Sequence, residues 1–223
     1  MISQALQFLR ELQENNNRIW FQENKERYDG LRNEYIRYVQ VLIDRISLFD
    51  PEIAGLEAKD CLFRIYRDIR FSPNKLPYKN YFGAYMAQGG RKSVRGGYYF
   101  HLEPDGCFFS GGIYCPEPAL LKMLRRDIYD QMDEFVGIIG NPAFKSVYKE
   151  LEGDTLKRMP AGYPADTPHG EILLHKDFCV STPVPDHFFD QPDWIDIAED
   201  YFRKLLPFNQ FLNYTVDEYQ GRV

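Results

Sequence analysis

The densest positive charge in the chain lies in one short stretch with five basic side chains, Arg64, Arg67, Arg70, Lys75 and Lys79. Arginine binds phosphate or carboxylate through two parallel hydrogen bonds, and lysine adds a mobile point charge. In an extended chain Arg64 and Arg70 stand about 20 Å apart, too far for one small anion. We therefore expect a site built from Arg67 or Arg70 together with the lysines. The predicted ligand-binding residues are Arg64, Arg67, Arg70, Lys75, Tyr78 and Lys79.

His101 and Glu103 form a second group that could do chemistry. They are two residues apart, so in a β-strand they share a face with Tyr99. A histidine beside a carboxylate can act as a general acid or base, which makes His101 and Glu103 the catalytic candidates. The alternative is a structural role, in which the carboxylate only satisfies the imidazole within a polar sheet face.

The neighbouring aromatic and basic side chains also have structural interpretations. Tyr66, Tyr78, Tyr81 and Tyr99 offer rings for stacking on a base or sugar, or for packing in the core. Arg67 falls on the apolar side of its predicted strand, where it needs a buried acid or a ligand as its partner. If the partner is a buried acid, the arginines are scaffold and the protein has a structural or interaction role.

The uneven charge of the chain limits its partners. The 223 residues carry a net charge of −6, so the surface as a whole does not suit nucleic acid. Between Cys61 and His101, however, eight basic residues face one acid, Asp68. This block indicates an anion site. With the glycine-rich loop from Gln88 to Gly97 it suggests, as an alternative, a phosphate clamp on nucleic acid.

Strong catalytic and cofactor motifs are absent from the sequence. It contains no P-loop, no dinucleotide-binding glycine fingerprint, no HExxH and no GxSxG. The four histidines are scattered along the chain, and we expect neither a metal site nor a cofactor.

The four cysteines and the apolar segments indicate the compartment. The cysteines lack CxxC spacing, which predicts reduced thiols. The N-terminal segment is amphipathic and charged, unlike a signal peptide, and no stretch approaches the ~20 apolar residues of a membrane-spanning helix. We therefore expect a cytoplasmic protein without a membrane partner.

One β-strand, from about Leu62 to Phe71, is predicted to position the arginines. Its odd-numbered side chains form an apolar face interrupted by Arg67, and its even-numbered ones are mostly polar. Pro73 and Pro77 require a loop after it. The clearest local signal is a β-hairpin from Gly97 to Tyr114, with two aromatic-rich strands around the turn Pro104-Asp105-Gly106.

Helical apolar stripes predict the remaining framework. They run from about Gln4 to Glu14, Lys25 to Leu48, Pro116 to Val136 and Pro192 to Leu206, and Phe178 to Val184 is a predicted edge strand. We predict a single α+β domain over residues 1–223, with long helices packed on one face of a largely antiparallel sheet. The polar face, or its end near the proline loop, is expected to form a basic cleft.

Four blocks of the sequence resemble a known family. They read FLRELQENNNRIWFQENKERYDGLRNEY, FRIYRDIRFSPNKLPYKNYF, GGYYFHLEPDGCFFSGGIYCPEP and LKRMPAGYPADTPHGEILLHKDF. Together they resemble a bacterial and fungal family of conserved hypothetical proteins, the domain of unknown function 2461. The resemblance implies one intact domain of mixed α and β structure, and it carries no activity, cofactor or catalytic residue. The family motif has Asp where this chain has Asn74, which disfavours a metal site in that loop.

These features predict a binder of, or an enzyme acting on, a small phosphate- or carboxylate-bearing ligand. One alternative is a nucleic-acid-associated protein that uses the basic block from residue 64 to residue 95. The other is a structural or interaction protein whose arginines are scaffold.

Overall fold

The computed structural model describes residues 2–222, which group into two compact units. The first unit comprises the N-terminal part of the chain up to Arg91, together with Tyr99–Phe109 and Pro183–Asp200. The second comprises Lys92–Tyr98, Ser110–Thr182 and the part from Tyr201 onward. The prediction that residues 1–223 form a single domain stays a prediction.

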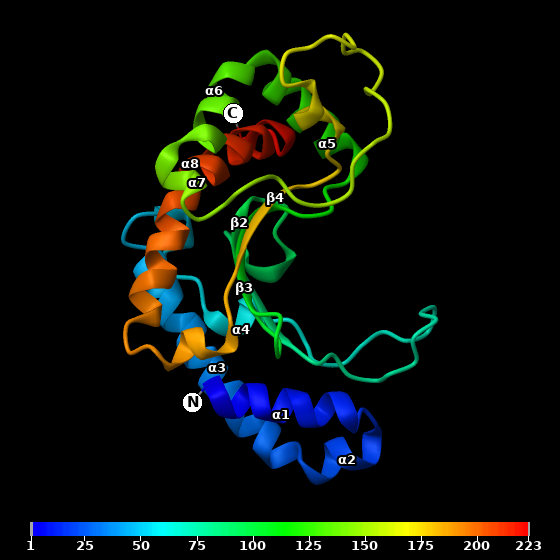
Figure 1. Cartoon of the computed structure of the whole chain (residues 1–223), viewed down its shortest axis with the longest axis vertical. Coiled ribbons are helices and arrows are strands. Elements are labelled where there is room, and N and C mark those ends of the chain that lie inside the picture. Colours follow the sequence, from blue (N-terminus) through cyan, green and yellow to red (C-terminus); the bar gives the residue numbers. More distant parts are fainter. Residues whose placement is uncertain (1, 223) are drawn as a thin grey trace. The chain divides into compact units, whose positions relative to one another are not determined.

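The fold is α+β, as predicted, and contains a four-stranded antiparallel sheet. The strands are β1 (Phe82–Met86), β2 (Gly97–Leu102), β3 (Phe108–Ile113) and β4 (Phe178–Pro183), paired in this order. β4 therefore lies at an edge, where the missing N–H of Pro183 is tolerated. Figure 1 labels β2, β3 and β4 and most of the helices.

The predicted hairpin is confirmed as β2 and β3. Asp105 adopts the left-handed conformation with φ 59°, and the Gly106 N–H donates to the Glu103 carbonyl at 3.0 Å. The backbone also approaches closely at the end of the hairpin. A Cβ atom on Gly111 would lie 2.5 Å from the Gly97 carbonyl oxygen, so only glycine fits there.

In the first unit, three helices precede the sheet: α1 (Ile2–Glu14), α2 (Arg18–Glu23) and α3 (Lys25–Ile46). Asn17 caps α2, accepting hydrogen bonds from the backbone N–H groups of Ile19 and Trp20. α3 covers one sheet face through Tyr35, whose ring packs on Phe82 and whose hydroxyl donates to the Phe100 carbonyl at 2.8 Å. Shorter elements of this unit are α4 (Ala58–Cys61), η1 (Pro51–Ile53) and η4 (Asp186–Asp190).

The helices of the second unit differ in detail from the prediction. The expected Pro116–Val136 helix is two helices, α5 (Pro118–Asp130) and α6 (Met132–Gly140), which break at Gln131. α7 (Pro142–Lys145) and η3 (Gly170–Leu174) follow. α8 (Trp194–Tyr219) begins in the first unit and belongs to the second from Tyr201 onward. It continues through Pro207, because burial of apolar side chains on both sides of the proline offsets the one lost hydrogen bond.

The predicted strand from Leu62 to Phe71 is wrong. The segment makes two isolated antiparallel bridges, Leu62 with Ala84 and Tyr66 with Tyr78. Three residues lie between Leu62 and Tyr66, whereas five lie between Tyr78 and Ala84. A regular ladder cannot accommodate this mismatch, so the chain bulges between residues 79 and 83.

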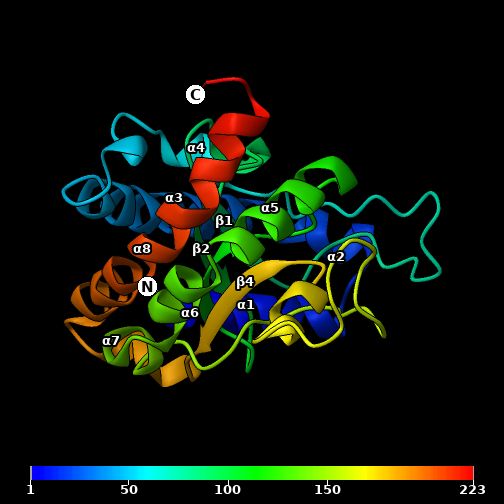
Figure 2. The same cartoon turned by 90° about the horizontal axis from the view of Figure 1, so that it is seen from above.

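The predicted core face of that segment is wrong for the same reason. Ile65 is buried, but Phe63 is 37% exposed and Phe71 is 95% exposed. We call residues 63–79 the arm. It leaves the sheet after α4 and returns to β1, and both views show this excursion (Figure 1, Figure 2). Across residues 2–222, no helix is both long and apolar enough to cross a membrane.

Candidate functional site

His101 lies at the centre of a row of three hydrogen-bonded side chains on one face of β2. Its Nδ1 is 2.9 Å from the Tyr99 hydroxyl, and its Nε2 is 2.9 Å from Glu103 Oε2. In a neutral imidazole with its proton on Nε2, Tyr99 donates to Nδ1 and Nε2–H donates to Glu103. Alternation along the strand places the three side chains together, as predicted from sequence.

Side chains from outside β2 fix this row. Asn80 Nδ2 donates to Glu103 Oε1 at 2.6 Å, so both carboxylate oxygens of Glu103 are held. The Phe108 ring stacks on the imidazole of His101 at 4.5 Å, and the Tyr81 ring packs against it at 4.4 Å. His101 is therefore buried, with 8% of its side chain exposed.

The burial of the row controls its protonation. Burial lowers the pKa of His101, an effect opposed by Glu103 and reinforced by the charge of Lys79. Burial also raises the pKa of Tyr99, with smaller contributions from Tyr81 and Glu103. At neutral pH the imidazole is thus an uncharged base in contact with a protonated phenol, an arrangement suited to passing a proton.

The backbone bulge brings a cationic group beside this row. Lys79 Nζ lies 5.5 Å from the centroid of the Phe63 ring and 5.3 Å from that of Tyr81. The pKa of Lys79 is lowered by burial and by the positive charges of Arg64 and Arg67. We call Arg64, Arg67 and Lys79 the cation cluster. In the described chain, no carboxylate lies within ion-pair distance of its three members.

The other predicted ligand-binding residues lie apart from the cation cluster or already have partners. Arg70 pairs with Asp68 through two hydrogen bonds of 3.0 and 2.6 Å, and Lys75 Nζ donates to the Ile69 carbonyl at 3.0 Å. Tyr78 is buried and its ring stacks on Phe21 at 4.0 Å. Arg67 is half-buried and has no acidic partner among residues 2–222, so the buried acid considered for it is not found.

Sequence reasoning missed Asn80, Phe108 and Gly83. Asn80 and Phe108 touch the row directly, while Gly83 leaves room for the Tyr99 hydroxyl. The turn at Pro104-Asp105-Gly106 could have indicated Phe108, because a tight hairpin brings the start of β3 beside the end of β2. No local pattern points to Asn80, whose position depends on the bulge.

The glycine-rich loop from Gln88 to Gly97 has a structural role. Arg95 is buried and pairs with Asp217 of α8. Asn213 of α8 accepts from the Gly96 N–H at 2.7 Å and donates to the Gly96 carbonyl at 3.0 Å. The arginine and the backbone of this part of the loop are therefore engaged within the second unit, which removes them from the predicted phosphate clamp.

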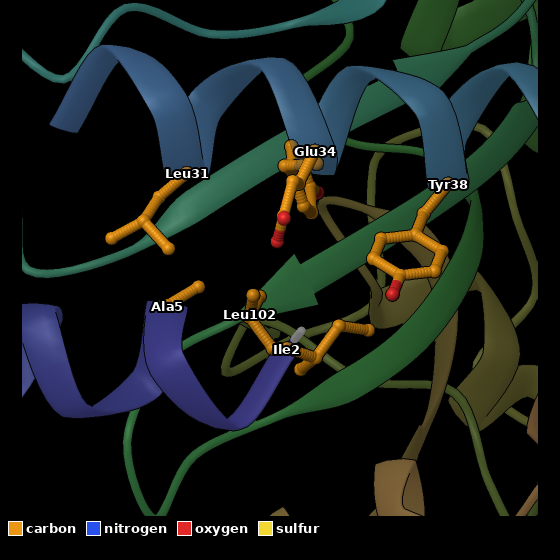
Figure 3. A pocket seen from close by; sticks show the side chains of 7 residues that line it. Ile2, Ala5, Leu31, Glu34, Tyr38 and Leu102 are labelled. Carbon is orange, nitrogen blue, oxygen red and sulfur yellow. The ribbon is translucent and has the colours of Figure 1, made fainter. Parts of the chain in front are cut away.

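A hollow in the first unit lies away from the cation cluster. It is bounded mainly by apolar side chains of α1 and α3 and by Leu102, and the carboxylate of Glu34 points toward it from α3 (Figure 3). Across residues 2–222, no group of three or more His, Cys, Asp or Glu side chains is arranged to hold a metal ion. All four cysteines are free thiols.

Comparison with known proteins gives a family but no characterised relative. The family model described as "Conserved hypothetical protein (DUF2461)" matches residues 4–211. No curated protein and no solved structure matches the chain.

Proposed function

Because the chain belongs to the DUF2461 family of conserved hypothetical proteins, whose description names no reaction, we propose a function from its side chains alone. The protein binds a small phosphate- or carboxylate-bearing ligand at the cation cluster of Arg64, Arg67 and Lys79.

The observation that carries this proposal is that none of the three cations forms an ion pair with a carboxylate of residues 2–222, although the Asp68 carboxylate, which pairs with Arg70, also attracts Arg64 from further away. Burial lowers the pKa of the half-buried Lys79, and the charges of Arg64 and Arg67 lower it further, so both arginines repel the Lys79 ammonium. Such an arrangement costs free energy in the unliganded protein. A bound anion removes the repulsion and accepts charge-assisted hydrogen bonds from both residue types.

A second candidate function is acid–base chemistry on the bound ligand, and the row Tyr99–His101–Glu103 favours it. A proton leaving the ligand passes to the Tyr99 oxygen while the phenol proton passes to His101 Nδ1. Glu103 then stabilises the imidazolium through Nε2–H, at the observed separation of 2.9 Å. No further reactant is needed for this transfer.

The experiment is a binding titration with inorganic phosphate, pyrophosphate and citrate, followed by calorimetry and thermal denaturation. A ligand at about 100 times its Kd should raise the free energy of unfolding by about 2.7 kcal/mol. Lys79→Ala or Arg67→Ala should weaken binding about tenfold, the loss of one charge-assisted hydrogen bond. Lys122→Ala, on the exposed face of α5, is the matched control.

Two results contradict the proposal. One is the absence of binding by all three anions. The other is equal binding by the wild type and the Lys79 and Arg67 variants, because the cations would then be scaffold. If the Lys79 or Arg67 variant is destabilised but its folded fraction binds the anion as tightly as the wild type, the cations are likewise scaffold.

A further inference from the structure

The arm displays aromatic and basic side chains in adjacent pairs. The pairs are Phe63 with Arg64, Tyr66 with Arg67, and Phe71 with Arg70. Phe63, Tyr66 and Phe71 are 37%, 46% and 95% exposed. Phe63 packs edge-on against Tyr99, and Tyr66 packs against Phe21 and Tyr78, so these two rings are held by the protein and leave part of their surface to solvent. Partly and fully exposed rings gathered on one segment indicate a surface that binds a partner.

Phe71 is the most pronounced case. It makes no ring contact with any described residue, and Leu76, on the returning half of the arm, is 45% exposed. The Phe71 ring therefore contributes almost nothing to the stability of the folded protein. An exposed aromatic ring with an arginine as its neighbour is suited to stacking against a planar group.

The charge of the arm defines the chemistry of its partner. Five cations, Arg64, Arg67, Arg70, Lys75 and Lys79, stand against the single carboxylate of Asp68, which pairs with Arg70, so four of the five have no carboxylate partner among residues 2–222. The rest of the chain is acidic enough to bring the net charge to −6. A polyanion is consequently attracted to the arm and repelled by the rest of the surface, so that it binds along the arm only.

We propose that the arm binds single-stranded nucleic acid, with bases stacked on Phe63, Tyr66 and Phe71 and phosphates on the arginines between them. The rings are three and five residues apart, at most about 10 and 16 Å along the chain. The arm bends between them instead of alternating as a regular strand, and each ring is proposed to contact a different nucleotide. Stacking needs bases that are not already paired, and the arm contains no helix to enter a major groove, which favours a single strand over a duplex.

A membrane surface fits the arm less well. A peripheral membrane site gathers apolar side chains on one side and cations at its border. Here the rings are distributed along the arm with an arginine beside each one. That alternation matches the repeating base and phosphate of a polynucleotide.

This inference goes beyond the proposed small-ligand site, although both use Arg64 and Arg67. Phe71 and Arg70 belong to the nucleic-acid surface alone. The row Tyr99–His101–Glu103 belongs to the small-ligand site alone. Variants at Phe71 therefore test the nucleic-acid surface without disturbing phosphate binding at Lys79.

The test uses the full chain and a fluorescein-labelled oligothymidylate of about 16 nucleotides, the upper site size of one single-strand-binding module, in anisotropy titrations at about 50 mM salt. Phe71→Ala and Tyr66→Ala should each weaken binding by about tenfold, the loss of one stacked base. Tyr114→Ala is the matched control, because Tyr114 is 78% exposed but lies outside the arm.

Salt dependence gives an independent readout. Lys75→Ala, at an exposed cation of the arm with no carboxylate partner among residues 2–222, should reduce the slope of log K against log salt by about 0.7, the release of one counterion from a single strand. Lys122→Ala, outside the arm, should leave the slope unchanged. Circular dichroism confirms that each variant is folded before it is compared.

Four results would overturn the proposal. These are no binding at low salt, binding unaffected by the combined Tyr66→Ala and Phe71→Ala changes, equal or tighter binding of a duplex of the same length, and sedimentation with phosphatidylglycerol vesicles without binding to the oligonucleotide. The last result would assign the arm to a lipid surface. If inorganic phosphate still binds in any of these cases, the proposed small-ligand site at the cation cluster is retained.

Discussion

The Tyr99 hydroxyl lies directly over Gly83, in the space where any other residue would carry its side chain. A Cβ atom at residue 83 would lie 2.5 Å from the Tyr99 oxygen. The hydrogen bond between Tyr99 and His101 of β2 therefore requires glycine at residue 83 of β1.

We predict that Gly83→Ala displaces the Tyr99 hydroxyl and lowers the free energy of unfolding by about 1–3 kcal/mol, as overpacking does. Urea denaturation measures the change. Gly30→Ala is the control, because a Cβ atom on Gly30 meets nothing within 4 Å and helix α3 should gain about 0.5–1 kcal/mol from alanine. If the clash is with the hydroxyl, the Gly83→Ala variant should recover part of its loss when Tyr99→Phe is added.

The second prediction concerns acid. Burial lowers the pKa of His101 below its ordinary value of 6.5, so the unfolded chain binds this proton more tightly than the folded protein. The unfolding free energy should therefore be highest above pH 6.5 and decrease as the pH falls from 6.5 toward the lowered pKa of the folded state.

Denaturation at about pH 8 and about pH 5.5 measures this effect. His101→Gln should lose less stability between the two pH values than the wild type. Identical pH dependence in the wild type and His101→Gln would show that the imidazole of His101 titrates alike in the folded and unfolded states.

The third prediction concerns the reactivity of Lys79. Its pKa is lowered by burial and by Arg64 and Arg67, so more of its amine is uncharged at a given pH. An acylating reagent at mildly alkaline pH should modify Lys79 faster than the exposed Lys122, as followed by mass spectrometry of peptides.

Arg67→Ala removes one of the repelling charges and should slow the modification of Lys79. Inorganic phosphate should protect Lys79 but not Lys122. Unchanged modification of Lys79 in the Arg67 variant would mean that the two charges do not interact.

The fourth prediction concerns the second unit. Asn213→Ala leaves the buried N–H and carbonyl of Gly96 without their partners, which should cost about 2–4 kcal/mol of unfolding free energy. Tyr214→Ala, on the next residue of α8 and 55% exposed, should change stability by less than about 0.5 kcal/mol. Equal effects of the two changes would indicate that the bonds to Gly96 are replaced by water.

The hairpin and the helices could be predicted because their signals are local. The turn at Asp105 and the alternation around His101 both depend on residues a few positions apart, so the row on β2 followed from the sequence. The arm shows the limit of this reasoning. Its apolar and polar residues alternate as regularly as those of a strand, but the segment that pairs with it contains two extra residues. Such a mismatch appears only when the two segments are paired, so neither sequence predicts it alone.

The same mismatch explains why the candidate site was only partly predicted. The bulge between residues 79 and 83 presents Lys79, Asn80 and Tyr81 together, beside side chains from β2. The sequence indicated Lys79 as a loop cation, but not its approach to His101. Bulges concentrate next to functional sites because they redirect side chains that a regular ladder would alternate between two faces.

The packing of Tyr81 and Phe108 against His101 has a consequence for the direction of proton movement. An imidazole held by two rings and by a hydrogen bond at each nitrogen does not turn over, so Nδ1 always meets Tyr99 and Nε2 always meets Glu103. The row therefore has two chemically different ends, a weak acid and a carboxylate. A proton that enters at the phenol and leaves at the carboxylate changes the tautomer of His101, and a return transfer must restore it before the next passage. Proton transfer along the row is therefore directional, from the phenol to the carboxylate. The two aromatic rings that fix this direction take no part in the transfer.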